Sequence, residues 1–428
     1  MTDSVVTSRD NSLTESKVEE VVVIGGGIIG TTIAERLQHE GKQVLLLDKD
    51  GPGMGCSKGN AGHFATDIII PLANMSNLLS VPKMLLDPLG PLTIKWSYFP
   101  KLTPWLMRYG WAALPHNVKA SVEALKVLNR PSIDRYQALL KRLNLEDMMI
   151  RKGQITVYCS EQAAHKNAAH ARFVREHGVK VEQLNGNEIR ELEPDLSSKV
   201  YGGLFYPDTA HCADPYRLVT ALASKFEQAG GRVKTAKVSD INVGGNEHVV
   251  IETDNGNIVA NEVVIAAGAW SNQLTSKIGH NVPLETERGY HLMLPNSHTR
   301  LTRAVSSFER SFVMTPMSEG LRLAGTVELA GLKSAENYAR SDILLNHAGE
   351  FLSDLDNQDA SRWMGHRPSL PDSLPVIGRS PKHKRVVMAF GHQHLGLTQA
   401  AVTADLVANE VFNRQQSVDI SAFGVDRF

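Results

Sequence analysis

The chain has 428 residues, with 45 lysine and arginine residues against 46 aspartate and glutamate residues, and a formal net charge of -1 at pH 7. Hydrophobic residues make up 42% and charged residues 21%, as in ordinary globular enzymes, and the length predicts more than one domain. This balance does not match a nucleic-acid-binding protein, and three scattered cysteines, Cys56, Cys159 and Cys212, match neither a disulfide framework nor a zinc site.

The first 18 residues are polar and mixed in charge, which predicts a disordered tail and not a signal peptide. No run of about 18 apolar residues follows, so no membrane-spanning helix is expected. With so few cysteines, we expect a reducing, cytoplasmic location. Peripheral contact with the inner face of the cytoplasmic membrane stays open, because one apolar segment described below could support it.

A strand, a glycine-rich turn, a helix and a second strand are predicted in VVVIGGGIIGTTIAERLQHEGKQVLLLDKD. Residues 21–24 form a β-branched run that is typical of a buried parallel strand. Residues 28–40 are expected to form a helix that Gly41 ends, and residues 44–47 the second strand.

The glycines of this stretch fit the G-x-G-x-x-G pattern. Gly25 allows a tight turn, Gly27 lets a pyrophosphate approach the backbone, and Gly30 lets the helix pack closely on the strand. Asp48 follows at the spacing expected of an acid that binds a ribose hydroxyl. The stretch therefore predicts a dinucleotide-binding βαβ unit.

The acid at position 48 disfavours a 2′-phosphate, which leaves NAD and FAD. Three later stretches favour FAD, the more extended cofactor. They are a loop of small residues at 53–63, a buried strand that runs into small residues at 261–274, and a strand, glycine-rich loop and long helix at 385–411. The amino end of that last helix suits a polar group such as a flavin carbonyl.

Six motifs between about residues 21 and 411 resemble one known family. They are VVVIGGGIIG, CSKGNAG, FYPDTAHCADPYRLV, VVIAAGAWS, GHRPSLPDSLPVIG and GHQHLGLT. They resemble the FAD-dependent amino-acid oxidoreductases that include D-amino-acid oxidase, glycine oxidase and D-amino-acid dehydrogenase. The stretch at 315–331 most resembles the bacterial D-amino-acid dehydrogenases, including hydroxyproline-related members.

The resemblance implies an α/β fold. A Rossmann-type, glutathione-reductase-like FAD-binding domain would be interleaved with an α+β substrate domain built on an antiparallel sheet. We expect the FAD-binding domain at 19–67, 212–273 and 362–414, and the substrate-binding or cap domain at 68–211 and 274–361.

The pattern of apolar and turn residues also predicts individual elements. The expected helices are 118–142, broken near Pro131, 161–177 and 215–229; the expected strands are 155–159, 233–238, 248–253, 263–266 and 289–295; a turn is expected at 254–257 and a hairpin with strands at 311–315 and 321–327.

By resemblance, FAD is bound without a covalent link, because the cysteine that tethers flavin in some relatives lies near the C-terminal loop and here no cysteine follows Cys212. Cys56 is expected to be a small buried residue and not a nucleophile. The residues expected to contact the cofactor are Gly25, Gly27, Ile28, Ile29, Gly30, Asp48, Lys49, Cys56, Ser57, Asn60, Ala61, Gly62, His63, Val238, Ala267, Gly268, Trp270, Gly391, His392, His394, Gly396, Leu397 and Thr398.

Residues 68–114 are rich in leucine, proline, methionine and tryptophan, including Trp96, Trp105 and Trp111. Such a segment fits a helical cap buried over the active site, which we favour. It also fits a surface that contacts a membrane or a partner protein.

Arg367, in GHRPSLPDSLPVIG, is the predicted anchor for the carboxylate of a substrate. A guanidinium can bind both carboxylate oxygens at once, and the resemblance gives the arginine of this motif that role. The alternative is a structural arginine that pairs with a nearby acid such as Asp372.

Tyr290 and His291 are neighbours on a predicted strand, so they face opposite sides. The resemblance places a tyrosine or another polar residue of this region in the pocket, and we expect Tyr290 to contact the substrate; a core tyrosine is the equal alternative. Arg288 shares the strand face of Tyr290 and is expected to be solvated or paired.

His394 and His63 complete the predicted catalytic set. The resemblance places the loop of His394 at the flavin ring and the substrate. His63 is expected near the ring, where it would stabilise negative charge, and a packing role is the alternative. His392 and His394 form an H-x-H pair, but no third ligand stands nearby and the chemistry requires none, so no metal is expected.

The expected reaction is oxidative deamination of a D-amino acid, with D-proline-like or hydroxy-D-proline-like substrates preferred. Hydride would pass from Cα to flavin N5, and the resulting imine would hydrolyse to a keto acid. The electron acceptor would be a quinone, an electron-transfer protein or oxygen. Two alternatives stay open, a FAD-dependent 2-hydroxy-acid dehydrogenase of the same fold and a flavin-bearing electron-transfer subunit without its own substrate. The oligomeric state is also open.

Overall fold

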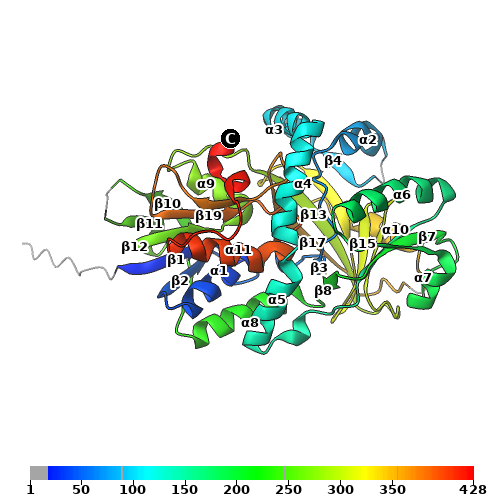
Figure 1. Cartoon of the computed structure of the whole chain (residues 1–428), viewed down its shortest axis with the longest axis horizontal. Helices are drawn as coiled ribbons and strands as arrows, with labels where there is room; N and C mark the ends of the chain where they lie inside the picture. Colours follow the sequence, from blue (N-terminus) through cyan, green and yellow to red (C-terminus); the bar gives the residue numbers. More distant parts are fainter. Residues whose placement is uncertain (1–17, 88–89, 245–246, 354) are drawn as a thin grey trace, which may run out of the picture.

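The computed structural model describes residues 18–87, 90–244, 247–353 and 355–428. The tail predicted at 1–18 lies outside these ranges except for Val18. The described chain forms two lobes side by side, an α/β lobe and an α+β lobe, and α4 (Pro115–Asn129) runs along the junction (Figure 1). The predicted fold class is confirmed.

The α/β lobe is built on an eight-stranded sheet, whose strands are β1 (Glu19–Ile24), β2 (Val44–Asp48), β9 (Arg232–Thr235), β10 (Val238–Asn242), β11 (Val249–Thr253), β12 (Gly256–Ile265), β18 (Val376–Arg379) and β19 (Val386–Phe390). The parallel centre has the order β9-β2-β1-β12-β19. The antiparallel strands β10 and β11 continue from β12, and β18 pairs with β19.

Both faces of this sheet are covered, which explains the run of β-branched residues in β1. Val21 and Val23 point to a core shared with α1 (Ile28–His39), α8 (Pro215–Gln228) and α11 (Gly396–Val411). Val22 and Ile24, which alternate with them along β1, point to a second core on the other face of the sheet. That core is formed with β10, β11 and the chain around α9 (Ser271–Thr275).

The α+β lobe is built on a nine-stranded sheet, whose strands are β4 (Leu92–Ile94), β5 (Gln154–Tyr158), β6 (Glu182–Asn185), β7 (Gly202–Tyr206), β13 (Glu285–Leu294), β14 (Ala304–Ser307), β15 (Phe312–Met317), β16 (Gly320–Leu329) and β17 (Ser361–Ser369). The order is β17-β13-β16-β15-β14-β5-β7-β6, with β4 paired to β16. One face packs on α7 (Gly186–Leu192) and α10 (Ala339–Ala348), and the other face is turned to the α/β lobe.

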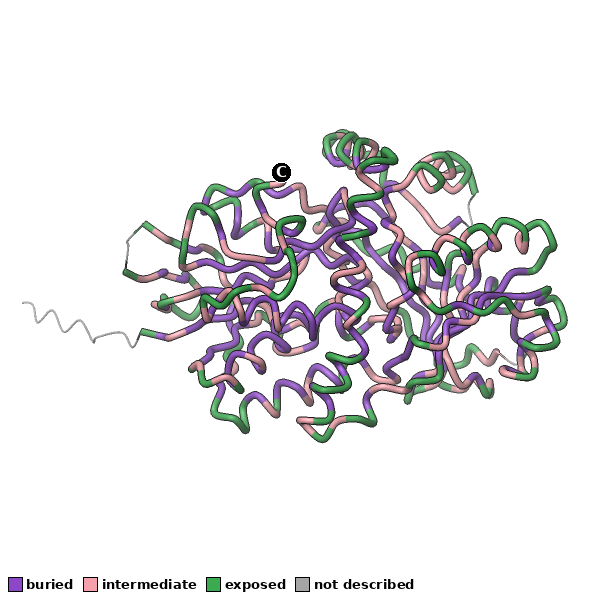
Figure 2. Tube along the Cα trace, viewed as in Figure 1, coloured by how far each residue is buried: buried purple, intermediate pink, exposed green. Residues whose placement is uncertain are grey.

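The remaining elements bridge or flank the two sheets. They are β3 (His63–Phe64), β8 (Ala210–His211), α2 (Met75–Leu86), α3 (Phe99–Ala112), α5 (Ser132–Leu143), α6 (Glu161–Glu176) and the 3-10 turns η1 (Trp96–Tyr98), η2 (Glu146–Met148), η3 (Gly268–Trp270), η4 (Ser421–Phe423) and η5 (Val425–Arg427). Figure 2 shows that the strands of both lobes are mostly buried, whereas α2 and α3 lie at the outer edge.

Most predicted elements are present, including the βαβ unit, the helix broken near Pro131 and the hairpin of β15 and β16. Two strand predictions differ from the structure. The strand predicted at 233–238 is two strands, β9 and β10, and the strand predicted at 263–266 is the end of the longer β12.

The predicted domain boundaries need two corrections. β17 pairs along its whole length with β13, so residues 361–369 belong to the sheet of the α+β lobe and not to the FAD-binding piece that was expected to begin at 362. Residues of α4 and α5 lie in the core that contains α1 and α11, so these two helices pack on the α/β lobe. An amphipathic pattern indicates that one helix face is buried, but it does not say against which sheet.

We expect Gly30→Ala to destabilise the protein, because a Cβ at this position would lie 1.9 Å from the carbonyl oxygen of Gly25. Overpacking against backbone costs about 1–3 kcal/mol, so the thermal midpoint should fall and flavin should be lost on gel filtration. Gly110→Ala is the control, since a Cβ there meets nothing within 4 Å. An unchanged midpoint and full flavin in Gly30→Ala would contradict this packing.

Candidate active site

The glycine-rich turn is built as the sequence predicts. Gly25 has φ +111°, and a Cβ there would lie 2.3 Å from the carbonyl oxygen of Ala266. Asp48 ends β2 beside the turn, where its Oδ2 accepts a hydrogen bond of 2.7 Å from the amide of Gly26. A Cβ at Gly27 would meet only the Ser57 hydroxyl, at 3.5 Å, so the backbone at the start of α1 is open to close approach.

This edge of the sheet fits a dinucleotide. An acid at the end of β2, an open glycine and the amide end of α1 are the groups that hold a ribose and a pyrophosphate. Lys49, which follows β2, lies over the ring of Trp270 in η3, 5.1 Å from its centroid, so two predicted cofactor residues meet here. Val238 begins β10, shortly after Ala236, whose amide donates to the carbonyl oxygen of Asp48.

The small-residue loop after β2 joins the two lobes. His291 on β13 contacts the carbonyl oxygen of Gly59 at 3.1 Å, and Arg322 on β16 donates to the carbonyl oxygen of Asn60 at 2.6 Å. The amide of Cys212 donates to the carbonyl oxygen of Gly62 at 2.6 Å. The predicted cofactor residues 56–63 are therefore held between the α/β lobe and the face of β13 and β16.

The loop before α11 approaches the same place. The hydroxyl of Thr398 accepts a hydrogen bond of 2.9 Å from the amide of Ala65. The amide of Gln393 donates to the carbonyl oxygen of Pro368 at 3.0 Å, which fixes this loop against the end of β17. Three segments far apart in the sequence thus meet beside Arg367.

Arg367 lies on the face of β17 turned to the α/β lobe. A Cβ at Gly289 on β13 would lie 2.5 Å from Cζ of Arg367, so the guanidinium lies directly over this glycine. Gly289 pairs in register with Gly365, and a Cβ at Gly365 would lie 2.0 Å from the ring of Trp363. The two paired glycines form a floor that Arg367 and Trp363 overlie. The alternative was an ion pair between Arg367 and Asp372. Asp372 instead pairs with Arg427.

Titratable groups surround the guanidinium of Arg367. Burial raises the pKa of Glu287, which pairs in register with Arg367, and the charge of Arg367 opposes this shift. Burial, aided by the charge of Arg367, lowers the pKa of His394 to about 4. Burial raises the pKa of Cys56 to about 12 against the charge of Arg367. At neutral pH the site therefore presents a neutral imidazole and a thiol. Cys56 is half-buried and not buried as expected.

Tyr290 lies on the opposite strand face from Arg367. Its side chain is buried, its hydroxyl donates to Glu328 at 2.6 Å, and the same hydroxyl accepts from the amide of Asn337. Arg288 is fully buried and paired with Glu328 at 2.8 Å. This geometry does not match the expected contact of Tyr290 with the substrate and fits the alternative, a core tyrosine. His291, its neighbour, has the inward-facing position.

His63 begins a buried polar cluster. It pairs across the β3–β8 ribbon with His211, and its Nε2 lies 3.8 Å from Oδ1 of Asp67. Burial, with smaller effects of His211 and His394, lowers the pKa of His63 to about 3, and burial raises the pKa of Asp67 to about 7. Nε2 of His63, Oδ1 of Asp67 and Nδ1 of His211 have no hydrogen-bond partner within the described chain.

Several residues of the site were not predicted. They are Glu287, Gly289, Trp363 and Gly365 at the floor and Asp67 and His211 in the buried cluster, whereas His291 was considered but Tyr290 was preferred to it. A signal for the floor was present, because residues 287, 289 and 291 and residues 363, 365 and 367 alternate along two strands. The pairing of those strands could not be read from either segment alone.

The inner side of α3 packs against the α+β lobe. The rings of Trp105 and Tyr109 stack with centroids 5.2 Å apart, and the Tyr109 hydroxyl donates to the carbonyl oxygen of Leu72 at 2.5 Å. Burial, with the charge of Glu287, raises the pKa of Tyr109, which shows that the helix reaches the neighbourhood of that carboxylate. The inner side of α3 therefore packs on the nine-stranded sheet, where Leu102 and Trp105 contact Ile94 and Leu329.

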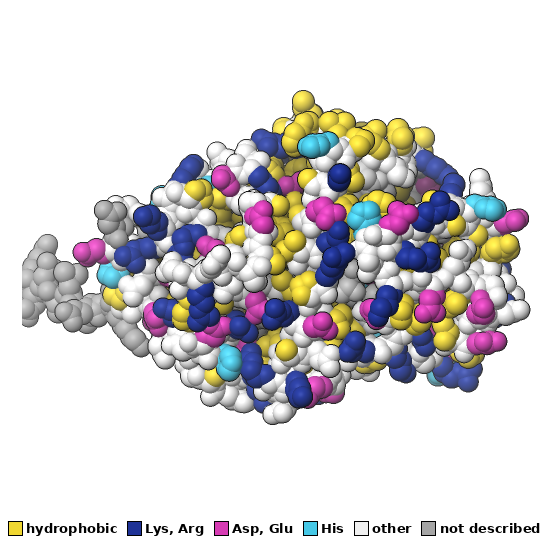
Figure 3. All heavy atoms as spheres, viewed as in Figure 1, with side chains coloured by type: hydrophobic (Ala, Val, Ile, Leu, Met, Phe, Trp, Pro, Cys, Tyr) yellow, Lys and Arg dark blue, Asp and Glu magenta, His cyan; other side chains and the backbone are white. Residues whose placement is uncertain are grey.

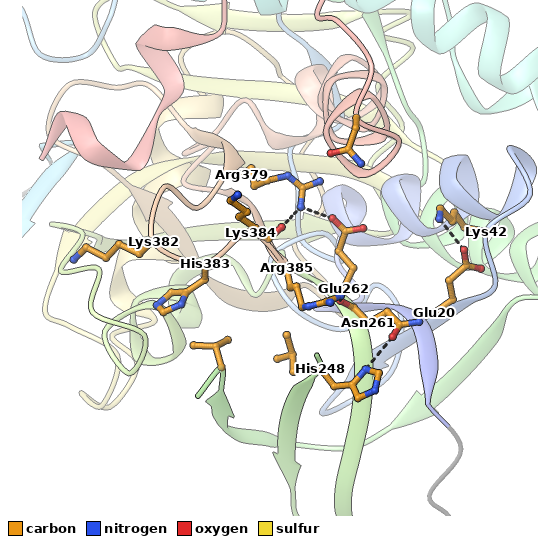
Figure 4. A pocket seen from close by; sticks show the side chains of 13 residues that line it. Glu20, Lys42, His248, Asn261, Glu262, Arg379, Lys382, His383, Lys384 and Arg385 are labelled. Carbon is orange, nitrogen blue, oxygen red and sulfur yellow. Dashed lines mark hydrogen bonds and ion pairs between the residues drawn. The ribbon is translucent and has the colours of Figure 1, made fainter. Parts of the chain in front are cut away.

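A separate surface pocket of about 740 Å³ lies at the amino ends of β1 and β19, away from the glycine turn. Figure 4 shows that many of its charged groups are paired, Lys42 with Glu20 and Arg379 with Glu262. Because ligands of this kind of sheet bind at the carboxyl ends of the strands, this pocket is not the active site.

Two further properties concern the described ranges only. No group of three or more histidine, cysteine, aspartate or glutamate residues there is arranged to hold a metal ion, and His392 instead contacts the Thr403 hydroxyl at 3.0 Å. Within the same ranges, no helix combines the length and apolar character needed to cross a bilayer.

A parallel sheet with this glycine turn, tied to a second sheet that presents an arginine, defines a dinucleotide-binding oxidoreductase fold. The chain belongs to the FAD-dependent oxidoreductase family, whose model matches residues 20–410. It is therefore a FAD-dependent enzyme.

Individual relatives cover nearly the whole chain. A D-amino-acid oxidase of Bradyrhizobium diazoefficiens is 36% identical and aligns over 95% of this chain and 98% of its own length. A D-amino acid dehydrogenase of Paramagnetospirillum magneticum is 28% identical, over 96% and 99%. Glycine oxidase from Geobacillus kaustophilus has a similar structure, with a TM-score of 0.74 at 24% identity over 96% of this chain and 98% of its own, which shows a shared fold.

Gly289→Ala is expected to displace the guanidinium of Arg367. Because the new Cβ meets the far end of a flexible side chain, stability should change little, whereas KM for a carboxylate substrate should rise about tenfold or more through loss of the bidentate contact. Steady-state kinetics and thermal denaturation would separate the two effects. Gly349→Ala, where a Cβ makes only ordinary contacts, is the control. Unchanged KM in Gly289→Ala would contradict the assigned position of Arg367.

His392 is expected to make the fold sensitive to acid. Burial lowers its pKa to about 3, below the ~6.5 of an unfolded histidine. Below pH ~6.5 the unfolded chain therefore binds a proton that the folded chain does not bind, and stability falls by ~2.7 kcal/mol by pH ~4.5. His392→Gln should flatten this dependence in denaturant titrations, whereas His165→Gln, at an exposed position, should not. Equal slopes for both variants would exclude His392 as the cause.

Proposed function

We propose that this chain catalyses the FAD-dependent oxidative deamination of a D-amino acid. The observation that carries the proposal is the guanidinium of Arg367, held over Gly289 on the sheet face turned to the FAD-binding lobe. A guanidinium in that position suits an α-carboxylate. The names of the two relatives, D-amino-acid oxidase and D-amino acid dehydrogenase, support this reaction class.

The chain's own residues would orient the substrate. Arg367 would bind both carboxylate oxygens, which restricts where Cα can lie. Neutral His394 and the carboxylate of Glu287 lie near that guanidinium and would accept hydrogen bonds from the substrate amine. When bound, FAD would supply the hydride acceptor. The oxidation requires a neutral amine, and Glu287, whose pKa burial raises, would take the proton that the amine loses.

The predicted cofactor contacts form part of this proposal. The groups supporting it are the turn at Gly25, the carboxylate of Asp48, the loop at 56–63, the turn at 267–270 and the loop at 391–398. His63 would lie near the flavin as a neutral imidazole, because its pKa is about 3. No cysteine follows Cys212, which supports non-covalent binding.

Within this class, D-proline-like and hydroxy-D-proline-like substrates are the proposed preference. Its support is the resemblance of residues 315–331 to D-amino-acid dehydrogenases. The electron acceptor would be a quinone, an electron-transfer protein or oxygen.

Anaerobic bleaching of the flavin spectrum tests the proposal. Both enantiomers of proline, 4-hydroxyproline and alanine, with glycine and 2-hydroxy acids, would be mixed with purified holoenzyme. We expect a D-amino acid to bleach the flavin at least about tenfold faster than its L-enantiomer, a difference of ~1.4 kcal/mol. Bleaching by a 2-hydroxy acid alone would identify a hydroxy-acid dehydrogenase. No bleaching by any compound would identify an electron-transfer subunit, and either outcome would overturn the proposal.

A further inference from the structure

The outer sides of α2, η1 and α3 form one exposed apolar surface, which we call the cap surface. Seven of the fourteen exposed large hydrophobic side chains on the described residues lie here, and an eighth, Leu114, follows α3. Five of them are between 66% and 84% exposed, and these are Leu79, Leu86, Trp96, Met107 and Trp111. Figure 3 shows hydrophobic side chains gathered at the top of the molecule, where α2 and α3 lie in Figure 1.

The exposure follows the helical repeat of α3. Pro100, Pro104, Met107 and Trp111 recur every three or four residues on the outside. The other side of the helix buries Leu102 and Trp105 in a small core with Ile94 and Leu329. α3 is therefore a two-sided apolar helix, and packing within the chain satisfies only its inner side.

α2 also exposes apolar side chains, and it buries even less of its surface than α3. It contains no buried residue, and Met75, Leu79 and Leu86 are exposed along one side. Trp96 and Phe99 continue the surface between the two helices, with ring centroids 5.7 Å apart. A contiguous apolar surface of this kind on a globular protein marks an interaction site.

The charged residues of this segment are nearly all cations. Residues 75–119 contain five lysine and arginine residues and a single acid, Asp87. All five cations, Lys83, Lys95, Lys101, Arg108 and Lys119, are exposed. The chain as a whole is nearly neutral, so the excess of cations is a local property of the cap surface and its border.

We propose that the cap surface docks on an anionic lipid bilayer. Exposed tryptophan, methionine and leucine side chains bordered by lysine and arginine are the composition of helices that lie in a membrane interface. Each cation near an anionic bilayer contributes about 1 kcal/mol, and tryptophan is favoured at the level of the headgroups.

A second copy of the chain fits this surface less well. A symmetric dimer would place the same patch on both sides, and like charges would then face one another without acidic partners. An anionic bilayer supplies the complementary charge over the whole surface. The inference does not depend on which substrate the enzyme oxidises, so its failure would leave the proposed reaction untouched.

Co-sedimentation of the flavin-loaded protein with vesicles tests the inference. We expect binding to vesicles of phosphatidylglycerol and phosphatidylcholine, weaker binding to phosphatidylcholine alone, and loss of binding as salt is raised. Met107→Ser/Trp111→Ser should abolish binding. Lys101→Glu/Arg108→Glu should weaken binding at least about tenfold, since each lost cation contributes about fivefold.

Matched controls lie elsewhere on the surface. Tyr201→Ser/Val418→Ser removes exposed apolar side chains, and Lys166→Glu/Lys237→Glu reverses two exposed cations; both should bind vesicles like the unaltered protein. Flavin content and flavin reduction by dithionite in solution should be equal in all variants, which shows that each one folds.

Three outcomes would overturn the inference. One is no binding to either vesicle by the unaltered protein. Another is equal loss in the control variants, which would show non-specific adsorption. The last is a dimer in sedimentation velocity that Met107→Ser/Trp111→Ser dissociates, which would identify the cap surface as an interface between two copies.

Discussion

The guanidinium of Arg367 lies over Gly289 because two antiparallel strands place a glycine diagonally beside it, where any larger side chain would push it away. Gly365, opposite Gly289, leaves room in the same way for the ring of Trp363. The chemistry proposed for this chain depends on that arrangement, since a substrate carboxylate can be bound at a defined position only if the guanidinium itself has one.

The contacts between the lobes bring this arginine to the cofactor edge. Arg322 and His291 bind carbonyl oxygens of the loop after β2, and Gln393 binds the carbonyl oxygen of Pro368 next to Arg367. Each of these contacts joins one sheet to a loop of the other lobe. The sheet face that carries Arg367 and the edge of the glycine-rich turn are therefore held relative to each other by these hydrogen bonds.

The cap differs in character on its two sides. Its inner side contributes Tyr109 near Glu287, and its outer side carries exposed tryptophan and methionine side chains. The two interpretations of residues 68–114 from sequence, a cover for the site and a contact surface, are thus not exclusive. One helix can bury a narrow stripe against the α+β lobe and still present apolar side chains outward.

Local chemistry made much of the fold predictable. The βαβ unit followed from glycine spacing and hydrophobic runs, and the break between α4 and α5 followed from Pro131. The partner of β17 was not predictable, because strand pairing across about 70 residues leaves no mark in either segment. For the same reason the inward residue of the pair Tyr290 and His291 could not be chosen, and the cluster of His63, Asp67 and His211 was missed.

The most direct test of the central claim is a titration of the oxidised flavin's absorption spectrum with benzoate, in the unaltered protein and in Arg367→Ala. The account predicts a saturable spectral shift in the unaltered protein and a dissociation constant at least about tenfold higher in the variant, because a charge-assisted contact contributes ~1.5–3 kcal/mol. Flavin content should be equal in both. An equal affinity for benzoate in a flavin-loaded Arg367→Ala protein would contradict the claim that this arginine is the carboxylate anchor.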